Sequence, residues 1–443
     1  MKVLGFAAGI AAAVSLLSSS SAFAATEIAW WHAMGGELGQ KLEEIVKGFN
    51  ESQSDYKVVP TYKGSYPETM TAAIAAFRAK QQPAIVQVFE VGTGTMMAAK
   101  GAVYPVYKLM ADQGEPFDPK GFLTAVVGYY TDTDGNMLSM PFNSSTPMLY
   151  YNKDVFKKAG LDPETPPKTW GQLEEFGKKI MDSGAAKCGF TTEWISWIQL
   201  ENLSAWHNQP IGTLQNGFGG LDTELTLNGP VQVKHWENLK KWQDSGLFQY
   251  GGPVGGNDAK PKFYSQECAI FFGSSATRAA VVANTKDAFA VGYGMLPYYD
   301  DVKGAPQNSI IGGATLWVLQ GVPEEQYKGV AKFFSYLSSA EVQADWHQFS
   351  GYLPITQAAY DLGKSQGFYE KNPGADVGIK EITLNPPTEN SKGLRFGNYV
   401  QVRDVIDQEF QELLAGSKTP QEALDAVVSR GNELLREFES ANG

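Results

Sequence analysis

The chain has few cysteines and histidines, the residues that most often bind metals. Two cysteines and four histidines occur among 443 residues, and the histidines are scattered without metal-ligand spacing. No complete Gly-x-x-x-x-Gly-Lys-Ser/Thr phosphate loop is present, and the Gly92-Thr-Gly94 turn has Met97 where a dinucleotide fingerprint needs its third glycine. We therefore expect no metal, no cofactor and no enzymatic activity.

Positive charge is also scarce, since 36 Lys and Arg face 48 Asp and Glu for a formal net charge of −12. Such a chain repels nucleic acid and anionic membrane surfaces, so neither is an expected partner.

Long hydrophobic runs are missing after the first residues of the chain. Met1-Lys2, the apolar residues 3–17 and Ala22-Phe-Ala24 are typical of a signal peptide cleaved after Ala24. No cysteine precedes Cys188, so a lipid anchor at the cleavage site is excluded. These features predict residues 1–24 as a signal peptide and a protein in the periplasm without a direct membrane anchor.

The two cysteines leave two alternatives open. In an oxidising compartment Cys188 and Cys268 can form one disulfide, which closes a long loop, or they can remain two buried thiols.

Strand-like and helix-like segments alternate from residue 28 onwards. Residues 28–31, 57–62 and 84–89 read as strands, and residues 38–49 and 67–80 as helices. This alternation predicts an α/β fold with a parallel sheet covered by helices, and the chain length predicts two lobes. Ligands bind beyond the carboxyl ends of such strands, which makes His32, the turn at residues 63–66 and Glu90 candidates.

Trp194 and Trp197 are the most informative pair of side chains. On an α-helix they share one face with Glu201 and Ser204, while Ile195, Ile198, Leu203 and Trp206 lie on the other face. Two indoles beside a carboxylate and a hydroxyl suit a small polar ligand. A half-exposed helix flank is the alternative interpretation.

Two later segments also combine regular structure with possible ligand contact. Residues 269–272 read as a strand that ends in Gly273-Ser274-Ser275 before a helix, which places Ser274 near the helix N-terminus. The glycine pair in the strand-like residues 310–318 is unfavourable unless a group must approach the backbone closely.

Several short sequence segments then resemble those of a known family. Tyr-Tyr-Asn-Lys-Asp-Val-Phe at residues 150–156 and Pro-Pro-Lys-Thr-Trp at 166–170 are similar to the periplasmic solute-binding proteins of carbohydrate-type ABC importers. Further strings at residues 31–32, 60–64, 142–147, 197–202, 305–308, 351–356 and 367–376 look like the branch of this family that binds sn-glycerol-3-phosphate. The resemblance spans essentially the whole chain after the leader.

The resemblance implies a type II, maltose-binding-like fold with the ligand cleft between two α/β lobes that close about a hinge. The first lobe would comprise residues 26–143 and 312–353, and the second 144–311 and 354–443. Carried over residue by residue, the ligand site would comprise Tyr66, Glu90, Ser145, Trp194, Trp197, Ser274, Gly313, Tyr352 and Arg403. Arg395 lies in a similar string and is the alternative arginine.

The implied ligand is sn-glycerol-3-phosphate or a glycerophosphodiester such as glycerophosphocholine, delivered to the membrane permease and ATPase of an ABC importer. Arginine, hydroxyl groups and a backbone amide would surround the phosphate, the tryptophans would pack on the alcohol, and Glu90 would accept hydrogen bonds from its hydroxyls. A sugar receptor of the same fold and a secreted glycerophosphodiester hydrolase are the two alternatives.

Overall fold

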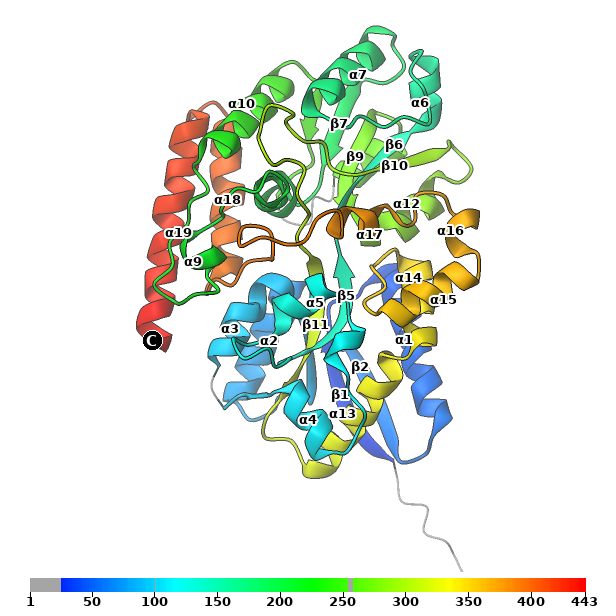
Figure 1. The fold of residues 1–443 in the computed structure, drawn as a ribbon, viewed down its shortest axis with the longest axis vertical. Coiled ribbons are helices and arrows are strands. Elements are labelled where there is room, and N and C mark those ends of the chain that lie inside the picture. The colour runs from blue at the N-terminus through cyan, green and yellow to red at the C-terminus, as the bar shows by residue number, and fades with distance from the viewer. Residues whose placement is uncertain (1–24, 100, 254–257) are drawn as a thin grey trace, which may run out of the picture.

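Two separate sheets organise the molecule, each within its own layers of helices (Figure 1). This computed structural model describes residues 25–99, 101–253 and 258–443; the predicted signal peptide, residues 1–24, lies outside them. The first sheet has the order β2-β1-β3-β11-β4, with β5 also paired to β11. Its strands are β1 Thr26–His32, β2 Tyr56–Tyr62, β3 Ile85–Phe89, β4 Val103–Tyr104, β5 Met140–Ser145 and β11 Gly312–Leu319.

The predicted strand and helix alternation is confirmed at the start of the chain. β1 pairs in parallel with β2 and with β3, joined by α1 Gly36–Ser52 and α2 Tyr66–Arg78. Ser65 and Glu68 form a reciprocal capping box at the start of α2, with proline in its first turn. The sheet is mixed rather than parallel, however, because β11 runs antiparallel to β3, β4 and β5.

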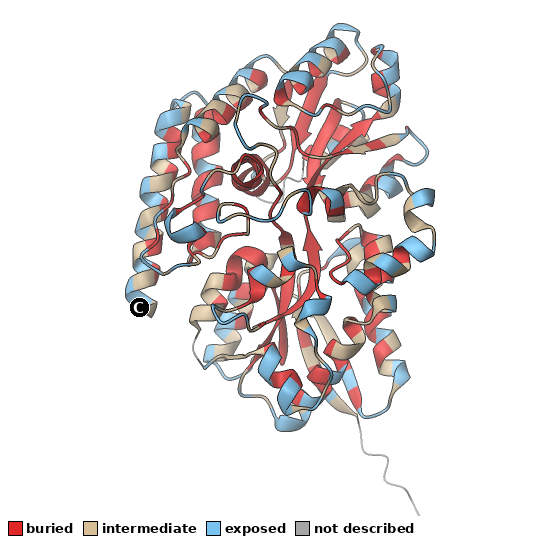
Figure 2. Cartoon of the chain, viewed as in Figure 1, coloured by how far each residue is buried: buried red, intermediate tan, exposed pale blue. Residues whose placement is uncertain are grey.

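The second sheet has the order β10-β6-β9-β7-β8. Its strands are β6 Pro147–Asn152, β7 Cys188–Thr192, β8 Phe248–Tyr250, β9 Cys268–Ser274 and β10 Val291–Gly294. The central strands β6, β9 and β7 are almost wholly buried, whereas the surrounding helices expose their outer faces (Figure 2). Burial on both faces explains the apolar runs in β6 and β9.

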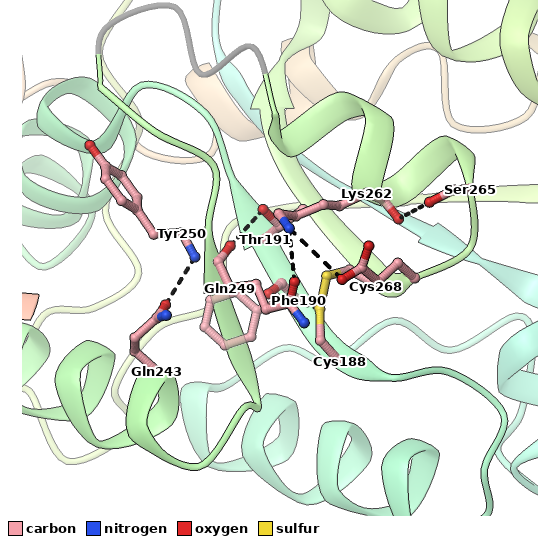
Figure 3. The surroundings of a disulfide bond; sticks show 10 residues. Cys188, Phe190, Thr191, Gln243, Gln249, Tyr250, Lys262, Ser265 and Cys268 are labelled. Carbon is pink, nitrogen blue, oxygen red and sulfur yellow. Dashed lines mark hydrogen bonds and ion pairs between the residues drawn. A yellow bond between two sulfur atoms is a disulfide. The ribbon is translucent and has the colours of Figure 1, made fainter.

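A disulfide joins two neighbouring strands of the second sheet (Figure 3). Cys188 at the start of β7 lies directly opposite Cys268 at the start of β9, and both are fully buried. Of the two alternatives left by the sequence, the structure therefore contains the disulfide.

The remaining helices cover the sheets, and the two longest C-terminal ones pack against each other beside the second sheet (Figure 1). The other helices of the first 250 residues are α3 Thr93–Ala98, α4 Val106–Asp112, α5 Thr124–Tyr130, α6 Lys153–Lys158, α7 Trp170–Asp182, α8 Leu203–Trp206, α9 Thr213–Asn216 and α10 Pro230–Asp244. Those that follow are α11 Ala259–Tyr264, α12 Arg278–Thr285, α13 Glu324–Leu337, α14 Ala340–Ser350, α15 Gln357–Ser365, α16 Phe368–Lys371, α17 Val377–Ile382, α18 Tyr399–Leu414 and α19 Pro420–Asn442.

The chain passes from the first sheet to the second through Thr146, the single residue between β5 and β6, and it returns between β10 and β11. The Thr146 hydroxyl lies 2.6 Å from that of Ser309 on the returning segment and donates to Glu381 Oε1 at 3.0 Å. Glu381, on α17, also accepts from the Leu296 amide at 2.8 Å. One buried carboxyl group thus links these first two crossings, while the lobe boundaries assigned from the sequence stay a prediction.

Candidate functional site

A cavity of about 700 Å³ lies between the two lobes and contains the predicted site residues. The first sheet and its connections contribute Tyr66, Glu90, Ser145, Gly313 and Tyr352, and the second lobe contributes Trp194, Trp197, Ser274 and Arg403. All nine residues line this one cavity. Its volume lies within the range of about 300–1,000 Å³ that is typical of pockets for small organic ligands.

Arg403, on α18, is held by two carboxylates. Its Nε and Nη2 groups donate to Glu201 Oε1 and Oε2 at 2.8 and 2.6 Å, and Nη2 also donates to Glu90 Oε1 at 2.7 Å. All three side chains are buried. Among the described residues no group accepts from Nη1, so its two N–H groups are available to a ligand in the cavity.

The electrostatics of this cluster follow from burial. Burial by itself lowers the pKa of Arg403, but Glu201 and Glu90 together raise it well above its usual value, so the guanidinium stays charged. Burial raises the pKa of Glu90, and the charge of Glu201 raises it further, against the opposing effect of Arg403. Fully ionised, the cluster carries one net negative charge.

Hydroxyl groups of the first lobe also line the cavity. Tyr66 OH lies 3.5 Å from Tyr352 OH and accepts from Asn143 Nδ2 at 2.9 Å. Tyr66 also stacks on Phe89 with a centroid distance of 5.4 Å, which fixes its ring. Burial raises the pKa of both tyrosines, so they remain protonated and can donate to an anionic ligand.

The glycine pair at the start of β11 has a physical explanation. A side chain at Gly312 would collide with the Trp197 ring, and one at Gly313 would collide with the Asn143 carbonyl oxygen. Gly313 also has a φ of +89°, which side chains rarely adopt. The close approach predicted from the sequence is therefore made by the protein's own tryptophan and neighbouring strand.

The α-helical face predicted for Trp194, Trp197, Glu201 and Ser204 is wrong. Trp194 has a φ of +52° and precedes the helix, and Trp197–Asn202 forms a π-helix, so α-helical spacing does not apply. Glu201 and Ser204 are fully buried rather than solvated, because Glu201 binds Arg403 and Ser204 donates to the Leu200 carbonyl.

Ser274 lies where the sequence predicted, at the start of a helical turn. Its hydroxyl accepts from the Ala276 amide at 3.2 Å, and its own amide donates to Glu193 Oε1 at 3.0 Å. Glu193 and Lys260 also line the cavity. Neither was predicted, because no spacing or periodicity in the sequence relates these two residues.

Other candidates lie outside the cavity. His32 is buried and accepts from the Met34 amide, and burial lowers its pKa to about 4. Lys63 lies over the Trp31 ring. Arg395 donates to the Thr131 carbonyl at 2.7 Å and lies 4.1 Å from the centroid of the Phe218 ring, so Arg403 is the arginine of the cavity.

Two observations bear on catalysis and metal binding. A Gly-x-Ser-x-Gly pattern occurs at residues 363–367, but Ser365 ends α15 and donates to the Leu362 carbonyl instead of occupying a strand-to-helix turn. Among the residues that the structure describes, no three His, Cys, Asp or Glu side chains are grouped to hold a metal ion. In the same part of the chain, no helix is long and apolar enough to cross a membrane.

Comparison with known proteins finds relatives that match nearly the whole chain. The glycerol-3-phosphate-binding periplasmic proteins UgpB of Yersinia pseudotuberculosis and Salmonella typhimurium are 52% and 51% identical to the chain, over 98% and 97% of its length and of theirs. Their names place them in the periplasm, and we place this chain there too.

Two solved structures share the two-lobe fold. UgpB of Mycobacterium tuberculosis in complex with glycerophosphocholine has a TM-score of 0.77 at 20% identity, covering 94% of this chain and 99% of that one. The GacH receptor of Streptomyces glaucescens has a TM-score of 0.78 at 18% identity, covering 93% and 99%. At these identities they show the fold alone, which is the predicted maltose-binding-like one. A family model of bacterial extracellular solute-binding proteins matches residues 44–376, and the chain belongs to that family.

Proposed function

We propose that this protein is a periplasmic receptor that captures sn-glycerol-3-phosphate and delivers it to an ABC importer. The observation that carries the proposal is the convergence of nine residues from both lobes on one cavity around Arg403, in a chain about half identical to glycerol-3-phosphate-binding proteins. The receptor binds its ligand and does not transform it, and its partners are the permease and ATPase subunits of the importer.

The proposed roles follow from the chemistry of the cavity. Arg403 offers two charged N–H groups from Nη1, and Tyr66, Tyr352, Ser145 and Ser274 offer hydroxyls, so a phosphate group meets charged and neutral donors together. The tryptophans form an apolar surface for the glycerol carbons. Glu90 accepts from a ligand hydroxyl when it is ionised.

Glycerophosphodiesters are a second ligand class. The structural relative from M. tuberculosis was solved with glycerophosphocholine, and a quaternary ammonium group can lie over an indole ring such as Trp194. A sugar receptor is the weaker alternative, because the relatives that are about half identical to this chain over nearly its whole length are named for glycerol-3-phosphate binding.

Calorimetry with glycerol-3-phosphate, glycerophosphocholine and maltose tests the proposal. We expect binding of glycerol-3-phosphate and none of maltose. Binding of maltose alone would discard the assignment. Chromatography of each ligand after incubation with the protein tests the absence of catalysis, and release of choline or free glycerol-3-phosphate from glycerophosphocholine would point to the hydrolase instead.

A further inference from the structure

A second charged pair lines the cavity beside Ser274. Glu193 follows β7 and Lys260 lies on α11, both in the second lobe. Lys260 Nζ lies 3.1 Å from Glu193 Oε2. The nine residues assigned from the sequence do not include this pair.

Glu193 is fixed in place by the turn that presents Ser274. Its Oε1 atom accepts from the Ser274 amide at 3.0 Å and from the Thr277 hydroxyl at 2.9 Å, and only 1% of its side chain is exposed. Within the described part of the chain, its Oε2 atom has no donor other than the ammonium group of Lys260. A buried carboxylate with one oxygen free holds a cation strongly, since an uncompensated charge in this position is costly.

Lys260 differs from Arg403 in how much charge it can offer to a ligand. Arg403 is already balanced by Glu90 and Glu201, whereas Lys260 faces one carboxylate. Of the described residues that line the cavity, these two are the cations. The ammonium group has three donors on a flexible stem, and 35% of the lysine side chain is exposed, so donors remain after the pairing with Glu193.

We propose that Lys260 is a specificity-determining residue that bridges Glu193 and the ligand phosphate, and thereby favours phosphomonoesters over diesters of cationic alcohols. This inference rests on the proposed function and names its preferred ligand class. A phosphomonoester carries between one and two negative charges near neutral pH, whereas a diester carries one. A choline group adds a positive charge that Lys260 repels.

Calorimetry on the full chain tests this inference with Lys260→Met and a matched control, Lys262→Met. Lys262 lies on the same helix but contacts Gln249 near the disulfide (Figure 3) and forms an ion pair with Glu267. Lys262 is not one of the residues that line the cavity. We expect Lys260→Met to weaken glycerol-3-phosphate binding about tenfold or more and glycerophosphocholine binding much less, because the lost attraction scales with ligand charge. The control should bind both ligands like the wild type.

The double variant Glu193→Gln/Lys260→Met separates direct contact from simple neutralisation of Glu193. If Lys260 contacts the phosphate, the double variant binds glycerol-3-phosphate as weakly as Lys260→Met does. Full recovery in the double variant, or an unchanged affinity ratio in Lys260→Met, overturns the inference while the receptor assignment stands. If the wild type did not bind glycerol-3-phosphate, the proposed function would be wrong, and this inference would fail because it depends on that function.

Discussion

Arg403 reaches the cavity with three of its five N–H groups already donating to carboxylates. This arrangement fixes the guanidinium plane before any ligand arrives, so little side-chain freedom is lost on binding. It also means that the fully ionised cluster presents no net positive charge to the ligand. The arginine therefore orients the bound phosphate with its fixed N–H donors, in addition to carrying a positive charge.

Replacing Arg403 tests this role. We expect Arg403→Ala to cost several kcal/mol of glycerol-3-phosphate affinity, as loss of one partner of a desolvated charge pair does. It should also lower stability, since Glu90 and Glu201 remain buried without their cation. Calorimetry on protein shown by circular dichroism to be folded measures the first effect. If Arg403→Ala bound glycerol-3-phosphate like the wild type and Arg395→Ala bound it more weakly, Arg395 would be the arginine that binds the phosphate.

Glu381 gives a pH dependence of stability at the crossing between the lobes. Burial raises its pKa to about 8, against its hydrogen bonds with the Leu296 amide and the Thr146 and Ser309 hydroxyls. Between pH 4.5 and about pH 8, the folded state therefore keeps a proton that the unfolded state has released. Across this range the free energy of unfolding falls as pH rises, by about 1.4 kcal/mol per pH unit.

Glu381→Gln mimics the protonated acid and should remove this contribution. In urea titrations, we expect the free energy of unfolding of Glu381→Gln to exceed that of the wild type by an amount that increases from pH 5 to pH 8. Parallel profiles of the two proteins would show that Glu381 does not titrate in this range.

Among the structural elements, the turn before the π-helix contains Trp194, which is only partly buried. Trp197 is part of the core and packs on Gly312, so the two tryptophans are not equivalent. Trp194→Ala should weaken glycerophosphocholine binding more than glycerol-3-phosphate binding, because an indole recognises the alcohol and not the phosphate. Calorimetry with both ligands measures the ratio, and an equal loss for both would contradict this role.

The disulfide belongs to the second sheet and not to the cavity. It closes a loop of 80 residues, for which chain entropy predicts about 4.5 kcal/mol of stabilisation. Cys188 lies at the start of β7, whereas Glu193 follows the end of that strand. We expect the Cys188→Ala/Cys268→Ala variant to lose this stability in denaturant titrations and to keep its ligand affinity. A large loss of affinity in folded protein would link the sheet to the site.

For the whole molecule, a cavity with walls from two lobes predicts closure around the ligand. Small-angle X-ray scattering should give a smaller radius of gyration with saturating glycerol-3-phosphate than without it, and maltose should cause no change. Identical curves with bound glycerol-3-phosphate would mean that the unliganded protein is already closed.

The sequence predicted local features better than distant pairings. Strand and helix alternation defined β1 to β3, because periodicity and capping are local. The antiparallel direction of β11 was missed, since it depends on a chain that returns from the other lobe. Residue patterns alone indicated Glu90, the two tryptophans, Ser274 and the glycine pair, and the family resemblance supplied the other site residues. The contact of Arg403 with Glu201, 202 residues apart, and that of Glu193 with Lys260 needed the fold.

The burial of Arg403 inside an acidic protein also affects the kinetics of capture. The chain has a formal net charge of −12, so its long-range field slows the approach of an anion, and dissolved salt weakens that field more than it weakens the buried contacts. Association should therefore become faster as ionic strength rises, while the dissociation rate stays nearly constant. A receptor of this design owes its affinity to slow release rather than to fast encounter.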